Sequence, residues 1–486
     1  MSVRSIVFLL LGFLLLQQVS AQSVTTIEGE APEYAGLNLV FQALVNPISM
    51  EKGDLFTVQV DEKGHFEQSV ELSVITNVSV DLGKFRGNIY LEPGMHYQFV
   101  LPPYKPRSDA ERFNPYFVPE DVVIGITNEK AQTLNSTIIK FDRQLDDLYS
   151  ADAVQIFSRG DKNKVKTIVN ELDSLYPAVE NSYFAQYKKY AYGELKSLAY
   201  KRQKRTLIKE VFDADTVDLN MPSFKVAFNT IFKSFFSSYL SSKQGKDLKD
   251  AFVKVATFDS LSVVMSSDDL FRNQEMTEIV LLKSLYDAFY SGRYNQQQII
   301  NLFKQAESTA CNKKVKDLAG QLHRKVNWLR AGSKAPGFTL YRLDGKERSL
   351  DSYDGKFVYL NFMHTENHAC KQDLQLLNVI SKRMKRDVTL VTIILDEDPT
   401  NAKKMIKENK YRWDFLHYGR QPKVALDYGI RALPVYYVID PDGKLQLTPA
   451  PAPGESFGPI FMEAVRQYNY EKLRKDKPKE KSIYDF

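Results

Sequence analysis

Between residues 25 and 103, hydrophobic and polar residues alternate in short stretches that turns separate. The stretches are rich in β-branched and aromatic residues and span positions 37–44, 55–60, 69–74, 78–82 and 97–101. Turn sequences such as Lys52-Gly53-Asp54 and Glu92-Pro93-Gly94 lie between them. Short strands at this spacing are typical of a small β-sandwich. We therefore predict a β-sandwich domain over residues 22–127, closed by the proline-rich loop at 102–106.

From residue 128 to residue 330 the hydrophobic period becomes that of a helix. Apolar residues recur every three or four positions in two stretches, Phe228, Ile231, Phe232, Phe235, Phe236 and Leu240, and Ile279, Leu282, Leu285, Tyr286 and Phe289. Glycine and proline are scarce here, so we predict a domain of long antiparallel helices joined by short loops. The aromatic stripe could line a ligand cleft, but core packing is the interpretation we prefer.

Strands and helices alternate over residues 331–475. Continuous apolar runs at 357–362 and 388–395 indicate strands covered on both faces. Helices are predicted at 368–384, 401–409 and 459–473, and a hairpin joins 435–439 to 445–447 through the turn Pro441-Asp442-Gly443. The chain as a whole is therefore predicted to be a multidomain α+β protein that ends in an α/β domain with a sheet of mixed direction.

The first residues predict export. Arg4 precedes an apolar run at 6–16, and Val19-Ser20-Ala21 places small residues before Gln22. This is the pattern of a cleaved secretory signal over residues 1–21, and an uncleaved anchor is the alternative. No later segment has the roughly 20 apolar residues of a membrane helix. Residues 476–486 are predicted to be a solvated basic tail.

Charge and cysteine content narrow the possible functions. The 65 Lys and Arg residues against 60 Asp and Glu residues give a net charge of +5 without clusters outside the tail, so a nucleic-acid partner is not expected. The two cysteines, Cys311 and Cys370, are too few for a disulfide scaffold in an exported protein. They either pair with each other or are buried free thiols. No cofactor is predicted.

Eight segments of the C-terminal domain follow one another in a characteristic order, at 332–338, 344–346, 349–350, 355–358, 360–362, 428–430, 433–434 and 439–444. Through these segments the domain resembles TlpA/ResA-type thioredoxin-like proteins and peroxiredoxins of the AhpC/TSA-redoxin superfamily. The resemblance implies a thioredoxin fold and, for intact members, thiol-disulfide exchange. The N-terminal region, with Leu91-Glu92-Pro93-Gly94, is similar to a domain of unassigned function often found ahead of such domains in Gram-negative bacteria, which favours the periplasm as the location.

The redox motif of that family is incomplete in this sequence. Eight residues follow Asn361-Phe362, ending at Cys370, and the family's tryptophan-x-x-tryptophan-Cys-x-x-Cys loop has the same length. The resemblance therefore places Asn367 at the attacking cysteine and Cys370 at the resolving cysteine. Both tryptophans are replaced, by Met363 and Glu366. Since an amide cannot attack sulfur and exchange needs two thiols, we predict that ordinary oxidoreductase activity is lost.

Two classes of function remain. As a binding module, the domain would use the loop at Leu433-Pro434, where the resemblance predicts a cis proline, to hold a periplasmic or outer-membrane protein or peptide by strand addition. As an enzyme, it would use Cys370 for residual thiol-oxidoreductase or peroxidase chemistry. The spacing of Thr365 from Cys370 does not fit the peroxiredoxin motif, so peroxidase chemistry is disfavoured.

A metal site in the same loop is the remaining alternative. His364, Glu366, His368 and Cys370 alternate along the sequence, and His417 could lie on a neighbouring strand. Imidazoles and a thiolate suit a soft or borderline metal. We prefer a polar, solvated loop and predict no metal, because ligand geometry at this spacing is undefined once a helix begins.

Overall fold

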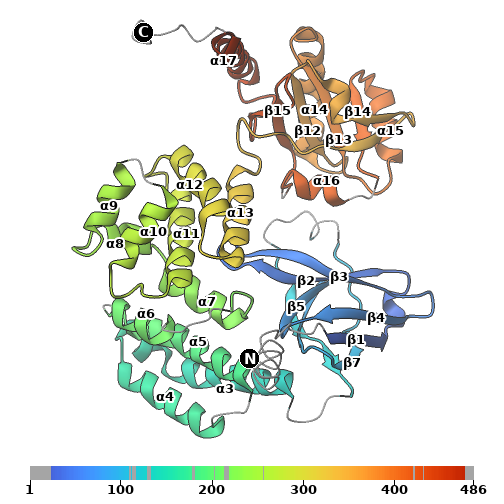
Figure 1. Cartoon of the computed structure of the whole chain (residues 1–486). Helices are drawn as coiled ribbons and strands as arrows, with labels where there is room; N and C mark the ends of the chain where they lie inside the picture. The colour runs from blue at the N-terminus through green and yellow to red at the C-terminus, as the bar shows by residue number, and fades with distance from the viewer. Residues whose placement is uncertain are drawn as a thin grey trace, which may run out of the picture. The chain divides into compact units, whose positions relative to one another are not determined.

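The computed structural model describes residues 23–476, apart from 109–110, 112–116, 129–132, 178–180, 202, 213–217, 255–256, 420–421 and 431. The predicted signal peptide and the tail beyond Asp476 lie outside these residues. The chain divides into two compact units, one of residues 1–107 and 118–326 and the other of residues 108–117 and 327–486. Each unit is described separately below (Figure 1).

The first unit begins with two β-sheets that share a core. One has the order β4-β1-β7-β9, with bounds His65–Leu72, Ser23–Glu30, His96–Val100 and Gly125–Ile126. The other has the order β3-β2-β5-β6-β8, with bounds Glu51–Gln59, Asn38–Asn46, Thr76–Leu82, Phe85–Leu91 and Glu120–Val123. Phe41 of β2 and Phe99 of β7 meet between the sheets, with ring centroids 6.2 Å apart. The predicted β-sandwich is present.

The proline-rich loop does not close the sandwich as predicted. After it, β8 pairs in parallel with β6, and β9 pairs antiparallel with β7, so each sheet gains an edge strand from beyond residue 118. These strands have only four and two residues and carry no clear alternation, and for that reason the sequence pattern did not reveal them.

Helices make up the rest of the first unit. Their bounds are α3 Leu134–Ala153, α4 Lys162–Leu175, α5 Ser182–Ala199, α6 Lys204–Phe212, α7 Pro222–Ile231, α8 Phe235–Leu240, α9 Lys246–Val253, α10 Phe258–Ser266, α11 Gln274–Tyr290, α12 Gln296–Thr309 and α13 Lys313–Asn327, with a π-helical turn at Val154–Ser158. The aromatic stripe is core, as preferred, since Phe228 and Phe232 are buried. The expectation of long helices was wrong at this point, because the chain breaks between α7 and α8, where Ser234 has a φ of 53°.

Within the first unit, the sandwich and the helices, which the sequence predicts as separate domains, contact each other directly. The side chain of Asn135 on α3 accepts a hydrogen bond from the backbone N–H of Tyr90 on β6 (2.9 Å) and donates one to the Tyr90 carbonyl (2.8 Å). Ile48, which follows β2, lies in the helical hydrophobic core. Through this pair of hydrogen bonds, the Asn135 side chain on α3 binds the backbone of Tyr90 at the edge of β6 and so attaches the helices to the sandwich.

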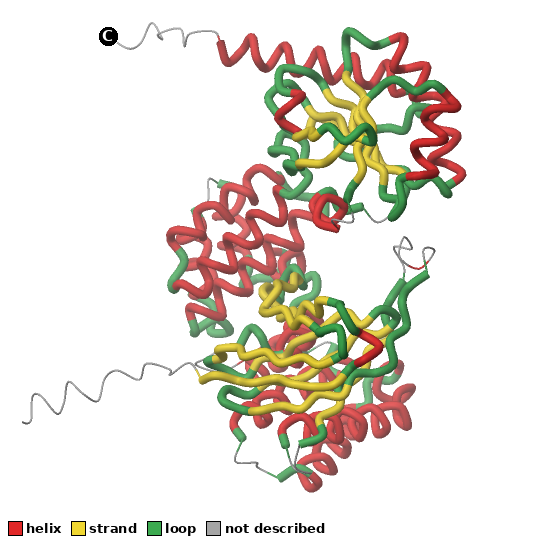
Figure 2. Tube along the Cα trace, turned by 90° about the vertical axis from the view of Figure 1, so that its right-hand side faces the viewer, coloured by secondary structure: helices red, strands yellow, loops and turns green. Residues whose placement is uncertain are grey.

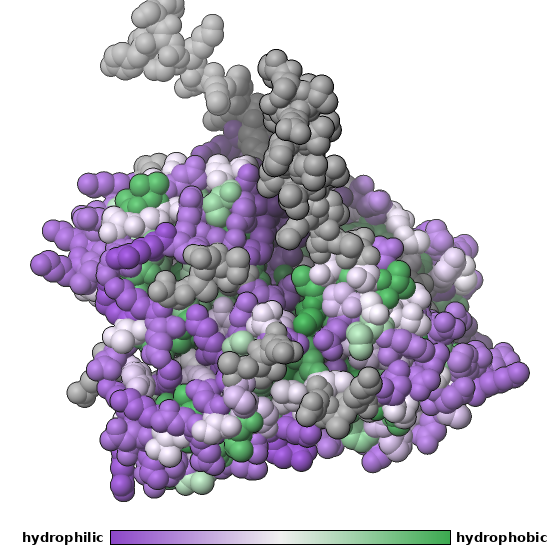
Figure 3. Space-filling model, turned by 60° about the horizontal axis from the view of Figure 1, so that its bottom comes forward, coloured by the Kyte–Doolittle hydropathy of each residue, from purple (hydrophilic) through white to green (hydrophobic). Residues whose placement is uncertain are grey.

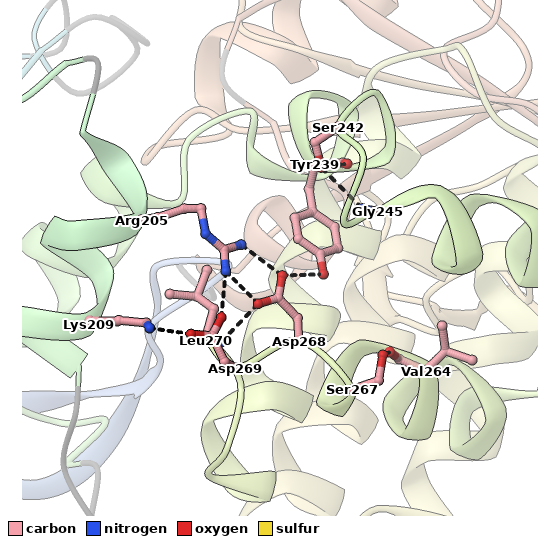
Figure 4. Close-up of polar contacts among 10 residues, drawn as sticks. All are labelled: Arg205, Lys209, Tyr239, Ser242, Gly245, Val264, Ser267, Asp268, Asp269 and Leu270. Atoms are coloured by element: carbon pink, nitrogen blue, oxygen red, sulfur yellow. Dashed lines mark hydrogen bonds and ion pairs between the residues drawn. The ribbon is translucent and has the colours of Figure 1, made fainter.

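An ionic cluster around the buried carboxylate of Asp268 links α6 and α8 to the connection between α10 and α11 (Figure 4). Arg205 donates two hydrogen bonds to the Asp268 carboxylate (2.8 and 2.6 Å), and the Tyr239 hydroxyl donates a third (2.9 Å). Asp269 beside it pairs with Arg205 and Lys209. The hydrogen bonds from Arg205 are the main cause that lowers the pKa of Asp268 well below its usual range. Asp268 is therefore held as a carboxylate.

The second unit is built on one sheet with the strand order β11-β10-β14-β13-β12-β15-β16. The bounds are β10 Thr339–Arg342, β11 Glu347–Ser349, β12 Val358–Met363, β13 Thr389–Ile394, β14 Asp414–His417, β15 Val435–Ile439 and β16 Leu445–Leu447. The helices are α14 His368–Arg383, α15 Thr400–Asn409, α16 Pro422–Asp427 and α17 Phe457–Asp476. In Figure 2 the strands of this unit lie between helices. β13 is parallel to β12 and β14, whereas β15 is antiparallel to β12, so the predicted mixed sheet is present.

Alternate residues of the central strands enter two separate cores, one on each face of the sheet. Leu360 and Phe362 of β12 lie in one core, and Tyr359 and Met363 pack on the other with Leu374 of α14. Burial on both faces explains why β12 reads as an unbroken apolar run.

No helix among the described residues is long and apolar enough to cross a membrane. The face of the molecule in Figure 3 is mainly hydrophilic, with small separate hydrophobic patches. The large apolar side chains are mostly taken up by the cores.

Candidate functional site

The site lies where two parallel strands of the C-terminal sheet end. Met363 of β12 is paired with Ile394 of β13. Two residues beyond this pair, the backbone N–H of Thr365 donates to both carboxylate oxygens of Asp396 (3.2 and 3.1 Å), and the Thr365 hydroxyl donates to the same carboxylate. Both residues are buried. Asp396, which follows the neighbouring strand β13, thereby anchors the loop that leads into α14.

Asn367 begins α14 as its N-cap. Its side-chain oxygen accepts a hydrogen bond from the backbone N–H of Cys370 (3.1 Å), which satisfies one of the donors that a helix N-terminus leaves unpaired. Its side-chain N–H donates to the backbone carbonyl of Leu433 (3.3 Å). One amide therefore joins the helix to the loop opposite.

That opposite loop contains Leu433 and Pro434, and it runs directly into β15. The Leu433–Pro434 peptide is cis, which confirms the prediction for this bond. The Leu433 side chain is half-buried and packs against the hydrophobic cores on both faces of the sheet. The structure thus brings three of the predicted site residues, Asn367, Leu433 and Pro434, to one place, with Cys370 three residues into the helix.

The Cys370 thiol is poorly suited to attack a disulfide. The residue is 2% exposed, and it lies in the core under α14. Burial is the main cause that raises the pKa of Cys370 to about 11, and the carboxylates of Asp373 and Asp396 add to the effect. Free cysteine has a pKa of about 8.5, so the Cys370 sulfur is more firmly protonated at neutral pH than an ordinary thiol.

Neither cysteine forms a disulfide. Cys370 is buried as predicted, but Cys311, which precedes α13, is exposed, so the expectation of two buried thiols was wrong for that residue. Desolvation by the nearby protein and a hydrogen bond with Glu278 raise the pKa of Cys311 to about 12. Its backbone N–H also donates to the Glu278 carboxylate (2.8 Å). Cys311 is therefore accessible and yet held as a thiol.

Each of the three histidines of the suggested metal set has a partner within the protein, and His364 and His417 both lie near Asp396, whose carboxylate is 3.9 Å from the His364 ring. The His364 ring accepts from the Glu366 N–H (3.2 Å), the His368 ring contacts Gln372 (3.0 Å), and the His417 ring contacts the Asp396 carbonyl (2.7 Å). Over the described residues, no group of three His, Cys, Asp or Glu side chains is placed to hold a metal ion. The alternating pattern in the sequence does not become a common site.

The sequence pattern did not single out Asp396. It lies two residues past the end of β13, beside the loop that begins past the end of β12. In α/β proteins, functional groups commonly lie at the carboxyl ends of adjacent parallel strands. The place of Asp396, just after a buried strand, was therefore the signal in the sequence that could have identified it as a candidate site residue. An acidic residue there anchors Thr365 and faces the first turn of α14.

The sheet, the helix N-cap beside the end of β12 and the cis-proline loop together define a thioredoxin-like protein. Residues 331–448 match the family model described as the AhpC/TSA family. The thiol-disulfide oxidoreductase ResA of Geobacillus thermodenitrificans is 31% identical over 116 residues, which are 24% of this chain and 66% of that protein. The thioredoxin-like protein YneN of Bacillus subtilis is 27% identical over 128 residues, 25% of this chain and 73% of that protein.

Among solved structures, the thioredoxin domain of a thiol-disulfide oxidoreductase from Bacteroides vulgatus is 25% identical to this chain. The likeness covers 29% of this chain and 97% of that one, with a TM-score of 0.25. The family and sequence matches confirm the predicted resemblance of the C-terminal unit to TlpA/ResA-type thioredoxin-like proteins.

Proposed function

We propose that this chain is an exported thioredoxin-like protein whose C-terminal domain no longer carries out dithiol-disulfide exchange and instead binds a partner. The observation that carries the proposal is Asn367. It takes the helix N-cap, the position at which the intact family places its attacking cysteine, and its amide is committed to Cys370 and Leu433.

The chemistry of exchange supports this proposal. The reaction needs a first thiolate to attack and a second thiol to resolve the mixed disulfide. An asparagine amide supplies no thiolate. Cys370 alone offers a buried sulfur with a raised pKa, three residues inside the helix.

The cis-proline loop is the proposed binding surface. In thioredoxin-like proteins this loop faces the helix N-terminus and offers backbone groups to an extended chain, and strand addition gives affinity through main-chain hydrogen bonds. The Leu433 carbonyl accepts from Asn367, but a carbonyl oxygen has two lone pairs and so keeps capacity for a second donor. The proposed partner is a periplasmic or outer-membrane protein or peptide, bound in an extended conformation.

The competing function is a residual single-cysteine thiol oxidoreductase or peroxidase that uses Cys370. Insulin reduction in dithiothreitol separates the two. We expect the mature full-length chain and its Cys370→Ser variant to show the same background rate. Turnover close to that of an intact thioredoxin, abolished by Cys370→Ser, would establish the enzyme and overturn the proposal.

Binding is tested with the same proteins plus Pro434→Ala. The intact chain and Cys370→Ser should capture the same partners from a periplasmic extract. Pro434→Ala should capture a smaller amount of them. Thermal melts of all three proteins control for misfolding. A partner that depends on Cys370 and is indifferent to Pro434 would point to a mixed disulfide instead of groove binding.

Export is part of the proposal and rests on the basic, apolar and small-residue pattern of residues 1–21. Expression in a Gram-negative host should give a mature protein that begins at Gln22 and is released with the periplasmic fraction. Intact mass and N-terminal sequencing measure this. A chain that keeps residues 1–21 and sediments with membranes would support the anchored alternative.

A further inference from the structure

A groove on the C-terminal unit lies between α15, the segment that leads into β14 and the turn after β10. Its volume is about 390 Å³, within the range of about 300–1,000 Å³ that is typical of small-molecule sites. The residues that line it are Arg342, Leu343, Asp344, Lys403, Ile406, Lys407, Lys410, Tyr411, Arg412, Trp413 and Phe415. Five of these eleven residues are Lys or Arg and one is Asp, so the groove combines positive charge with apolar and aromatic side chains.

The aromatic floor of the groove follows from the alternation of a strand. Tyr411, Trp413 and Phe415 are two positions apart, so their side chains lie on one face of β14 and of the residues before it. The ring centroids of Tyr411 and Trp413 are 5.0 Å apart, and those of Trp413 and Phe415 are 4.7 Å apart. The Trp413 indole N–H donates to the Thr392 hydroxyl (2.9 Å), which orients the indole. Tyr411 and Trp413 are only half-buried, so part of each ring is accessible.

The lysines beside this floor lie on one face of α15. Lys403, Lys407 and Lys410 follow one another at intervals of four and three residues, which makes them neighbours on the helix surface. Among the described residues, none of the three forms an ion pair. Lys404 on the same helix does not line the groove, and it pairs with Glu408 at 4.0 Å. Positive charge is therefore left unbalanced on the face that borders the groove, where like charges repel one another.

The helix dipole accounts for only part of this charge. A cation near the C-terminus of a helix is favourable, which explains Lys407 in the last turn of α15. Lys403 lies in the first turn, where a cation is unfavourable. Lys410 has a φ of 56°, a left-handed conformation in which glycine is the ordinary residue at a helix end. Lys403 and Lys410 thus occupy positions that local stability disfavours, and such positions are frequent at functional sites.

The acidic side chain at the groove is already paired. The Arg342 guanidinium lies 3.5 Å from the Asp344 carboxylate and 2.8 Å from that of Asp414. Arg412, by contrast, forms no ion pair among the described residues. Its planar guanidinium is suited to bind two oxygens of one phosphate or carboxylate. Arg412 and the three lysines therefore carry charge that an anionic ligand could neutralise.

From these features we infer that the groove binds a phosphate monoester with an apolar organic group. The phosphate carries a charge of about −1.5 to −2 at pH 7 and has three acceptor oxygens, which suits several cations better than a singly charged carboxylate does. It would lie at Lys403, Lys407 and Arg412, and the organic group would lie against Tyr411 and Trp413. The inference is independent of the proposed function, because none of these residues belongs to the N-cap or the cis-proline loop.

Isothermal titration of the mature full-length chain tests the inference at about pH 8, where a phosphate monoester is a dianion. The probes are phenyl phosphate, benzenesulfonate, which has the ring and a single charge, and glycerol phosphate, which has the phosphate and no apolar group. We expect saturable binding of phenyl phosphate and about tenfold weaker binding of each of the other two. An affinity for phenyl phosphate no higher than for either control, or no saturable binding of it, would overturn the inference.

Charge variants locate the phosphate. Lys403→Gln combined with Lys407→Gln should weaken phenyl phosphate binding about tenfold, since each exposed charge pair contributes about twofold to fivefold. Lys382→Gln combined with Lys404→Gln removes the same charge at exposed positions outside the groove and should change the affinity less than about twofold. Equal effects of the two double variants would show that the overall charge of the protein attracts the probe, and the inference would then be wrong.

The tryptophan in the floor reports where the probe binds. The chain has two tryptophans, so Trp328→Phe leaves Trp413 as the only one. Phenyl phosphate should change the fluorescence of Trp413 with the same midpoint that calorimetry gives for this variant. Heat of binding without a change in Trp413 emission would place the probe outside the groove and overturn the inference. Thermal melts of all variants control for misfolding.

The same chemistry can come from a free phosphate monoester or from a lipid headgroup. Vesicles of phosphatidylcholine with and without phosphatidic acid, whose headgroup is a phosphate monoester, distinguish the two sources. Sedimentation with phosphatidic acid vesicles alone, lost in the Lys403→Gln and Lys407→Gln double variant, would assign the groove to the lipid in addition to phenyl phosphate. Binding of phenyl phosphate without sedimentation would assign it to a free ligand. The inference stands in both cases, since both include phenyl phosphate binding.

Discussion

The side chain of Asn367 donates a hydrogen bond to the backbone carbonyl of Leu433, across the 66 residues that separate them in the chain. The same amide caps α14 through the Cys370 N–H. Asn367 is thus a structural link between the helix and the cis-proline loop. This double role leads to a first prediction about stability.

Asn367→Ala should destabilise the protein. Loss of an N-cap costs about 1 kcal/mol, with a range of about 0.5–2 kcal/mol. Urea unfolding of the full chain, followed by the near-ultraviolet signal of the C-terminal unit, measures the change. Lys371→Ala, at an exposed position on the same helix, is the matched control and should have little effect. Equal midpoints for the two variants would show that the cap contributes nothing.

Asn367→Cys should restore a redox-active pair. The new thiol would stand at the helix N-terminus, where the dipole favours a thiolate, three residues before Cys370. Mild oxidation should leave a single titratable thiol, Cys311, and insulin reduction should rise above the background of the native chain. Asn367→Cys combined with Cys370→Ser should remove the gain. Two or more titratable thiols after oxidation would show that positions 367 and 370 do not face each other as required.

Cys370 should alkylate slowly at neutral pH. Burial and two nearby carboxylates raise its pKa to about 11, and only the thiolate reacts. In a Cys311→Ser background, the rate with iodoacetamide should stay low near pH 7–8 and rise towards pH 11. Mass spectrometry of the alkylated protein follows the reaction. A rate that levels off below pH 8 would contradict the buried thiol and favour the residual-enzyme alternative.

Asp268→Asn should destabilise the first unit by about 2 kcal/mol. Hydrogen bonds to a charged group contribute about 1.5–3 kcal/mol each, and the partial solvation of the Arg205 side chain lowers the total effect. Asp269→Asn is the matched control. Its side chain is 53% exposed and its ion pairs lie at the surface, where such pairs contribute about 0–1 kcal/mol. Thermal melts at pH 7 compare the two variants.

The same cluster predicts a direction of pH dependence. The pKa of Asp268 is lowered in the folded protein, mainly by the hydrogen bonds from Arg205. Its contribution is therefore fully present above the pKa of the unfolded carboxyl, about 3.9, and is lost as the pH falls below that value. The stability difference between the native chain and Asp268→Asn should shrink under these acidic conditions. A difference that grows on acidification would contradict the assignment.

Much of the C-terminal fold followed from the sequence because its signals were local and strong. The apolar runs of β12 and β13 are buried on both faces, and the amphipathic stretch from His368 became α14. The β15–β16 hairpin has the predicted bounds. The residues of each of these elements favour the structure that the element adopts, so tertiary contacts did not change the predicted secondary structure.

Other features depended on distant contacts and were not predicted. β8 and β9 are strands because they meet the edges of existing sheets, and the break at Ser234 interrupts a stripe that remains apolar throughout. At the site, position counting found Asn367 and Cys370, but not Asp396, whose role arises only when two strands end side by side. The hydrogen bond from Asn367 to Leu433 likewise needed the three-dimensional structure.

The contact of Thr365 with Asp396 has a consequence for how such a protein evolves. The loop before α14 is held by a threonine and an aspartate that lie outside the helix, and neither depends on the residue at position 367. A single substitution at 367 can therefore change the reactivity of the site without disturbing the anchor of the loop. Descendants of one ancestor can gain or lose chemistry here while selection continues to act on an unchanged backbone.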